Sequence, residues 1–407
     1  MTTTRTSRAL ILSVLTAANF LGYAARNALF LAYDDLRAQF HLDDEALGQL
    51  GTAFIAAQAA ATIPFGWAGD RYGRGRMIKL GLLLASVAGV LGPLLHSFPA
   101  LLISRTAVGL GLAVVVPVAN SVLAELFEGR AKASRIAIFN LGLFVGGAVG
   151  LAGGQFLGYP WILYVCALPG FAVALAVAWL PLPSTDTSSA SRSLRFGKGE
   201  LGALLRARSL RLLMVSATAM AFAAGSFAAW FPEFLRSDKH LSDQQTLAVM
   251  GAALAAGLVG VLIGGRLGDA WRARARAGRL WTIVLGMSAT LPAVATCILL
   301  PAGPQLVVAS MATMFFVSWY HAPMAATVDD LASADRAATV QAVVVFTMHL
   351  IGTAPSSWVI GRLSQEIGLQ AAMWVPTAAL AVAALAMAAA TRSFHADADA
   401  ARAAATA

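Results

Sequence analysis

Twelve long apolar runs dominate this sequence of 407 residues, and they are typical of a chain that crosses a membrane many times. Each run holds about 20 mostly apolar residues, the length that a helix needs to cross the hydrocarbon core of a bilayer. The sequence therefore predicts an all-α membrane protein with twelve transmembrane helices. With ends loose by several residues, the runs cover about 9–32, 44–69, 76–96, 99–124, 133–157, 160–180, 210–235, 245–268, 279–300, 303–328, 337–360 and 370–391.

The composition excludes a soluble protein of this length. Hydrophobic residues make up 58% of the chain and charged residues 12%, whereas soluble domains average roughly 45–50% and 25%. So few charged side chains cannot cover the surface of a soluble fold. The first run is too long for a secretion signal, carries Asn19 and Arg26, and precedes eleven further runs, so we expect it to be retained as a helix.

The longest polar segment divides the runs into six and six. Residues 181–208 contain a stretch rich in Ser and Thr, followed by Arg192, Arg195 and Lys198. We therefore predict an N-terminal six-helix half at 1–180, a cytoplasmic linker at 181–208, and a C-terminal six-helix half at 209–407 that ends in a short cytoplasmic tail.

The positions of the basic residues predict the orientation of the helices. The formal net charge is +9, and membrane proteins concentrate Lys and Arg in cytoplasmic loops. With the N-terminus placed in the cytoplasm, 23 of the 29 Lys and Arg residues fall in cytoplasmic segments, four fall outside and two fall within the membrane. We expect both termini in the cytoplasm and the lipid bilayer as partner. Topology explains the basic charge, so we expect no nucleic acid.

The polar residues also argue against a metal site, a cofactor and an enzyme. The two cysteines, Cys166 and Cys297, both lie in apolar runs, which excludes a disulfide framework and a thiolate metal site. No run carries a cluster with metal-ligand spacing or a nucleophile beside a base. We therefore predict no metal, no cofactor and no enzymatic activity.

A glycine-rich charged segment follows the second run of each half. The first contains Gly66, Asp70, Arg71 and Arg74, and the second ends with Asp269 after Gly264, Gly265 and Gly268. An acid can cap a neighbouring helix N-terminus, and arginines can bridge to adjacent helix ends. Because the pattern recurs at the same place in each half, it indicates an internal repeat of the kind found in transporters.

The first of these segments resembles the loop signature of the major facilitator superfamily. A second signature of that superfamily is similar to Arg105-Thr-Ala-Val-Gly109-Leu-Gly111 in the fourth run. The resemblance implies two six-helix halves that alternate access to a central cavity, and a gating loop formed by Gly66, Asp70, Arg71, Arg74 and Asp269. A stripe of glycines in the fifth run predicts close helix packing, and in the superfamily such a stripe is also associated with exchange or export.

A narrower resemblance links the chain to the spinster-like lipid transporters. Segments 33–36, 40–44 and 48–54 in the first half, and 225–235 and 349–357 in the second, are similar to that family. The resemblance implies a lysophospholipid or a related substrate. Two positions depart from the family pattern, because Ala25 stands where it has an acid and Leu112 where it has a glutamate. Both replacements remove groups that could carry a coupling proton.

Two arginines, Arg26 and Arg105, lie inside predicted membrane helices, where an unpaired charge costs several kcal/mol and marks a pathway by default. The nearest acid to a run interior is Glu233. Arginines without an acid bind phosphate or carboxylate well, so we predict an anion-binding cavity. The alternative is that each guanidinium bonds backbone carbonyls or extends toward the membrane surface.

Aromatic residues and two histidines complete the predicted site. The predicted substrate-binding residues are Tyr23, Arg26, Arg105, Trp230, Trp319 and Tyr320, and ordinary helix packing is the alternative for each aromatic residue. His321, His349 and Glu233 are predicted proton-coupling residues, since histidine changes charge near neutral pH. The alternative for the histidines is a neutral, hydrogen-bonding role.

These features predict a secondary active transporter for a small organic or amphipathic anion, with a lysophospholipid as one candidate. We expect a monomer in a bacterial inner membrane. The composition suits a GC-rich bacterial genome, because arginine outnumbers lysine and alanine is abundant. One alternative is a proton-coupled efflux pump for drugs or metabolites. Another is a membrane enzyme or receptor, although the chain offers no sizeable soluble domain that could read out a signal.

Overall fold

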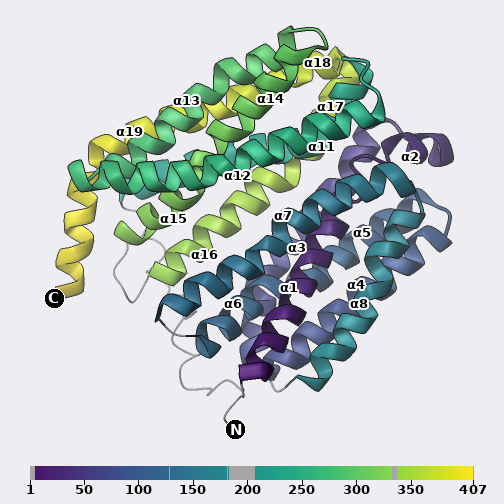
Figure 1. The fold of residues 1–407 in the computed structure, drawn as a ribbon, viewed down its shortest axis with the longest axis horizontal. Helices are drawn as coiled ribbons and strands as arrows, with labels where there is room; N and C mark the ends of the chain where they lie inside the picture. The colour runs from purple at the N-terminus through teal and green to yellow at the C-terminus, as the bar shows by residue number, and fades with distance from the viewer. Residues whose placement is uncertain (1–4, 128, 181, 183–206, 332–336, 407) are drawn as a thin grey trace. The chain divides into compact units, whose positions relative to one another are not determined.

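The computed structural model describes residues 5–127, 129–180, 182, 207–331 and 337–406. These residues form α-helices, one 3₁₀ helix and one π-helix, with no β-strand among them (Figure 1). The chain divides into two compact units. The N-terminal unit comprises Met1–Arg192 with Ser357–Arg362, and the C-terminal unit comprises Ser193–Ser356 with Leu363–Ala407. The predicted linker, 181–208, lies mostly outside the described residues.

The helices follow one another along the chain with short connections. The first part of the chain forms α1 (Arg5–Asn27), α2 (Tyr33–Phe40), α3 (Asp44–Tyr72), α4 (Arg74–Leu94), α5 (Phe98–Leu112), α6 (Val115–Leu126), α7 (Gly129–Leu157) and α8 (Trp161–Trp179). The second part forms α11 (Arg208–Ser237), α12 (Asp243–Arg274), α13 (Gly278–Leu299), α14 (Pro304–Val317), η1 (Ser318–Tyr320), α15 (His321–Asp330), α16 (Ala337–Thr347), η2 (Met348–Thr353), α17 (Ala354–Ile367), α18 (Leu369–Ala372) and α19 (Trp374–Thr406).

Eleven segments of the described chain are long and apolar enough to cross a membrane, and they match eleven of the predicted runs. The remaining run, 303–328, is present in three pieces, α14, η1 and α15, each shorter than a membrane span. Several predicted ends differ from the structure, and α12 and α17 extend to Arg274 and Ile367, beyond the predicted 268 and 360. Helix α1 ends at Asn27, before the short helix α2, and α19 continues to Thr406 where a short tail was expected.

Three membrane helices are interrupted, and a proline follows each interruption. Pro117 lies just after the break between α5 and α6, Pro323 follows η1, and Pro355 follows the π-helix η2. Proline lacks an N–H donor and its ring clashes with the carbonyl four residues earlier, which here falls within each interrupted stretch. Other prolines, such as Pro64 and Pro232, lie inside continuous helices. Proline therefore favours these breaks without being sufficient for them.

The predicted glycine stripe packs α7 against α1. A methyl group added at Gly146 or Gly150 would collide with the backbone carbonyl oxygens of Phe20 and Ala24, respectively. Only glycine allows the two backbones to approach this closely, and small residues drive helix association in membranes for that reason. The stripe therefore fixes the position of α1, the helix that carries Tyr23 and Arg26.

Candidate functional site

The Arg105 side chain ties α5 to the last turn of α1. Its Nη1 donates to the carbonyl oxygen of Ala25 at 2.8 Å, and its Nη2 donates to that of Arg26 at 3.3 Å. The guanidinium carbon lies 4.6 Å from the centre of the Phe54 ring on α3. Arg105 is 2% exposed. These contacts match the alternative in which the arginine binds backbone carbonyls.

The chemistry of a helix end explains why Arg105 lies there. The last four carbonyl groups of an α-helix have no partner within the helix, and the dipole places negative charge at that end. Ala25 and Arg26 lie in the final turn of α1, which ends at Asn27. A cation delivered from α5 satisfies these carbonyls and stabilises the end of α1. Arg105 therefore serves as a cap of α1, and its two terminal nitrogens are already engaged by the protein.

Arg26 lies beside this contact but is engaged differently. Its side chain is half-buried, and its guanidinium carbon lies 5.9 Å from the centre of the Tyr23 ring. Among the residues that the structure describes, the Arg26 guanidinium makes no hydrogen bond or ion pair. Of the two predicted intramembrane arginines, Arg26 is thus the one whose donors are available to a ligand.

A small pocket borders Arg26 where α1, α3 and the break between α5 and α6 meet. Tyr23, Arg26 and Gln58 contribute polar groups to its wall, whereas the Asn19 amide, also in the wall, donates to the Phe139 carbonyl at 2.9 Å. Leu112 and Val115 flank the break and form its apolar side. The pocket therefore combines one available guanidinium with an apolar surface. Its complete lining is Ala18, Asn19, Gly22, Tyr23, Arg26, Gln58, Leu112, Val115 and Val116.

In the C-terminal unit, both predicted histidines lie at helix interruptions. His321 is the first residue of α15, directly after η1, and is exposed. Its ring lies tilted against that of Tyr320, with ring centres 4.0 Å apart. His349 lies within η2, and its Nδ1 is 3.4 Å from the Thr353 hydroxyl. Short 3₁₀ and π segments inside helices are frequent at functional sites.

Three other predicted residues are engaged inside the C-terminal unit. Trp230 is fully buried and Trp319 is 8% exposed, so neither ring lies on a surface open to a ligand in this structure. Glu233 is 5% exposed and pairs with Arg236 at 3.0 Å, one helical turn away. The Glu233 carboxylate therefore already has an ion-pair partner on its own helix.

In the N-terminal unit, the predicted gating segment spans the end of α3 and the start of α4. Arg74, the first residue of α4, is buried and pairs with Glu125 near the end of α6. Arg71 lies over the rings of Trp67 and Tyr72, at 5.4 and 5.8 Å. The Asp70 side chain lies outside the described part of the structure. Gly66 faces Pro117, with van der Waals space for a small group between them.

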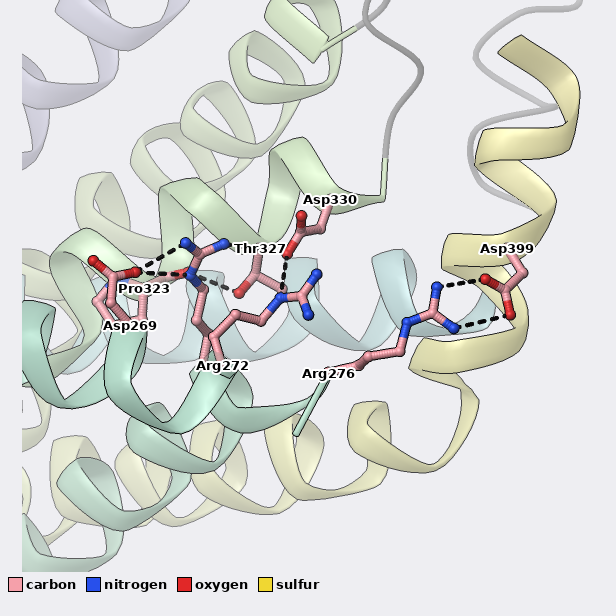
Figure 2. Close-up of polar contacts among 8 residues, drawn as sticks. Asp269, Arg272, Arg276, Pro323, Thr327, Asp330 and Asp399 are labelled. Atoms are coloured by element: carbon pink, nitrogen blue, oxygen red, sulfur yellow. Dashed lines mark hydrogen bonds and ion pairs between the residues drawn. The ribbon is translucent and has the colours of Figure 1, made fainter. Parts of the chain in front are cut away.

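In the C-terminal unit, the corresponding segment forms a larger charge network (Figure 2). Arg279 near the start of α13 pairs with Asp269 at 2.9 Å and with Asp330 at 3.3 Å. Arg272 near the end of α12 also pairs with Asp330, at 3.4 Å. The same arrangement thus recurs in both units, with an arginine at the start of one helix bound to an acid at the end of a broken helix.

Sequence inspection missed four members of these networks: Glu125, Arg272, Arg279 and Asp330. The acids could have been found, because each lies at the end of the fourth run of its half, just as the recurring glycine segments lie after the second. Arg272 and Arg279 are two of several basic residues in one loop. Only the three-dimensional arrangement distinguishes them from Arg274 and Arg276.

Sequence comparisons place the chain among known transporters. Residues 15–343 match the model of the Major Facilitator Superfamily. Protein spinster of Drosophila melanogaster is 25% identical over 377 residues, which cover 87% of this chain and 62% of that protein. The sphingosine-1-phosphate transporter SPNS2 of Danio rerio is 25% identical over 393 residues, 87% of this chain and 75% of the relative. Protein spinster homolog 1 of Rattus norvegicus is 31% identical over 241 residues, 56% and 45% of the two chains.

Solved structures agree on the fold. A bacterial homolog to the human lysosomal transporter Spinster, in an inward-facing and unoccupied conformation, superposes with a TM-score of 0.84 at 20% identity, over 97% of this chain and 99% of that one. The nucleoside transporter NupG superposes with a TM-score of 0.74 at 11% identity, over 93% and 98%. The predicted superfamily is confirmed: the chain belongs to the Major Facilitator Superfamily and is a multi-pass membrane protein related to the spinster transporters.

Proposed function

We propose that this protein is a secondary active transporter that moves a small organic or amphipathic anion by alternating access, with the anionic group bound at Arg26. The observation that carries the proposal is the available Arg26 guanidinium in a partly apolar pocket, next to an Arg105 whose two terminal nitrogens already donate to backbone carbonyls. The likeness to a protein named as a sphingosine-1-phosphate transporter supports a phosphate-bearing lipid, such as a lysophospholipid.

The physical argument starts from the cost of burying a charge. An unpaired arginine within a membrane helix costs several kcal/mol, and a bound anion would offset that cost. A guanidinium offers paired N–H groups that match a phosphate or a carboxylate. The apolar wall of Leu112 and Val115 suits the adjoining part of an amphipathic molecule.

Coupling and gating residues belong to the same proposal. His321 is exposed at a helix break, and it is our first candidate for a proton carrier, ahead of His349. The charge networks of Arg74, Asp269 and their partners each join helix ends within one unit, and we expect them to hold those ends in place as the two halves rock around the substrate. Asp70 and Arg71 belong to the same gating loop by their sequence positions.

We place the protein in a bacterial inner membrane as a monomer, with both termini and the ends of α3 and α12 in the cytoplasm. The excess of Lys and Arg in these segments supports the orientation. The likeness to a bacterial homolog of Spinster supports the bacterial membrane.

Uptake into proteoliposomes tests this function. Purified protein would be assayed with and without a pH gradient, on a panel of lysophosphatidylglycerol, sphingosine-1-phosphate and cationic amphiphiles. We expect uptake of the anionic compounds, lost in Arg26→Gln and retained in Arg274→Gln, a control arginine that makes no ion pair with a described residue. Uptake of cations alone would contradict the proposal and favour a drug efflux pump. If the uptake rate does not change with the pH gradient, the histidines do not carry a coupling proton.

A further inference from the structure

Helix α11 begins at Arg208, and the described residue before it supplies no cap. This residue, Ala207, makes no side-chain capping bond. Helix starts favour Ser, Thr, Asp or Asn at this position, because a side-chain oxygen there accepts from the N–H of the second or third helical residue. Within the described part of the chain, the first turn of α11 takes such a partner from a distant helix.

Asp397 supplies that partner from α19, 188 residues away. Its Oδ2 accepts from the backbone N–H of Ser209, the second residue of α11, at 2.7 Å, and from the Ser209 hydroxyl at 2.6 Å. Ser209 is fully buried. A local capping residue would satisfy the same N–H, and the carboxylate also lies at the positive end of the α11 dipole.

A second carboxylate on the same extension holds the connection between α12 and α13. Asp399 accepts two hydrogen bonds from Arg276, at 2.6 and 3.2 Å, in a paired geometry (Figure 2). Paired contacts of this kind are the strongest and most directional that arginine makes. The contact raises the pKa of Arg276 above its ordinary value.

The extension itself is packed against the unit. Helix α19 contains 33 residues, whereas about 20 suffice to cross a membrane. Beyond the apolar part, Phe394 is 1% exposed and Ala398 is 2% exposed. Residues four apart share one face of a helix, so these two side chains hold the extension in place while Asp397 and Asp399 reach their partners.

We propose that residues 393–400 form a clasp that caps α11 from the other end of the C-terminal unit's sequence and binds it to the α12–α13 connection. Through these contacts the C-terminal end of α19 would control the order of the first turn of α11. The clasp belongs to the C-terminal unit, whereas Arg26 belongs to the N-terminal unit. Releasing it should therefore alter the rate of the conformational cycle and leave substrate affinity unchanged.

Hydrogen–deuterium exchange on the full-length protein in nanodiscs tests the clasp without any substrate. Loss of a helix N-cap changes local stability enough to speed opening about fivefold. We expect Asp397→Ala to accelerate exchange by about that factor in peptides covering 207–216, with little change in α12 away from its end. Arg276→Gln should give a smaller increase, and its neighbour Arg274→Gln none.

The double variant with swapped charges, Arg276→Asp with Asp399→Arg, should restore slow hydrogen–deuterium exchange at 207–216. Unchanged exchange at 207–216 in Asp397→Ala, or an equal effect in Arg274→Gln, would overturn the proposal. If Asp397→Ala does not fold, Asp399→Ala tests the proposal instead, since it removes only the exposed contact with Arg276. We then expect faster exchange at 207–216, and an unchanged exchange rate there would overturn the proposal.

Transport supplies the second readout. With sphingosine-1-phosphate as the probe, Asp397→Ala should lower turnover severalfold at an unchanged KM, and unchanged turnover would overturn the link between the clasp and the conformational cycle. If wild-type protein transports none of the anionic amphiphiles in the panel, the proposed function fails and the exchange result still decides whether the clasp exists.

Discussion

Replacing Arg105 with methionine should destabilise the N-terminal unit, whereas the same change at Arg26 should not. Methionine keeps most of the side-chain length but cannot donate to the carbonyls of Ala25 and Arg26. A hydrogen bond from a charged donor contributes about 1.5–3 kcal/mol. Because one of the two bonds is long, at 3.3 Å, and because removing the charge also removes its desolvation cost, we expect a net loss of about 2–4 kcal/mol.

Thermal unfolding of the purified variants, followed by tryptophan fluorescence, measures this loss. A change of 1 kcal/mol shifts Tm by about 2–4 °C for a domain of 150–250 residues. Arg105→Met should therefore lower Tm by about 4 °C or more. Arg26→Met should leave Tm unchanged or raise it, because Arg26 makes no hydrogen bond with a described residue and the change removes an unpaired charge. An equal fall in both variants, or no fall in Arg105→Met, would refute the assignment of Arg105 as the cap of α1.

Two further predictions concern packing and gating. Gly150→Ala should lower Tm, because the added methyl group collides with α1 and overpacking costs about 1–3 kcal/mol. Gly251 has open space around it, so the control Gly251→Ala should leave Tm unchanged or raise it. Equal Tm values for the two variants would contradict the close packing of α7 against α1. Arg279→Gln breaks the ion pairs with Asp269 and Asp330, and at this partly exposed site we expect a stability change below about 1 kcal/mol but a severalfold slower uptake of sphingosine-1-phosphate. The exposed Arg266 provides the matched control as Arg266→Gln, and equal uptake rates would contradict a gating role.

The membrane helices could be predicted from sequence because length and hydropathy largely determine them. Run 44–69, for example, coincides with the span Asp44–Gly69. The internal breaks could not, since Pro117, Pro323 and Pro355 follow interruptions while Pro64 and Pro232 do not. Whether a membrane helix continues past a proline depends on whether neighbouring groups satisfy the freed backbone carbonyls. Those neighbours are known only once the tertiary structure is known.

The roles of individual charges were harder to predict than their positions. Arg26 and Arg105 are the same residue type inside predicted membrane helices, yet only one finds backbone carbonyls within reach. Lys239 is one of the four basic residues that the predicted topology places outside, and in the structure its Nζ donates to the Ile298 carbonyl near the end of α13 at 2.8 Å. Asp397 similarly caps α11 from 188 residues away. Such contacts depend on the tertiary fold, and no spacing rule reveals them.

Binding of a matched ligand pair to purified protein tests the central claim most directly. Sphingosine-1-phosphate and sphingosine share an apolar chain and differ in the phosphate, and isothermal titration would compare both on wild-type protein and Arg26→Gln. Loss of charged hydrogen bonds to the phosphate should raise the Kd of sphingosine-1-phosphate about 10- to 100-fold and leave that of sphingosine unchanged. An unchanged Kd for sphingosine-1-phosphate, or an equal change for both ligands, would contradict an anion site at Arg26.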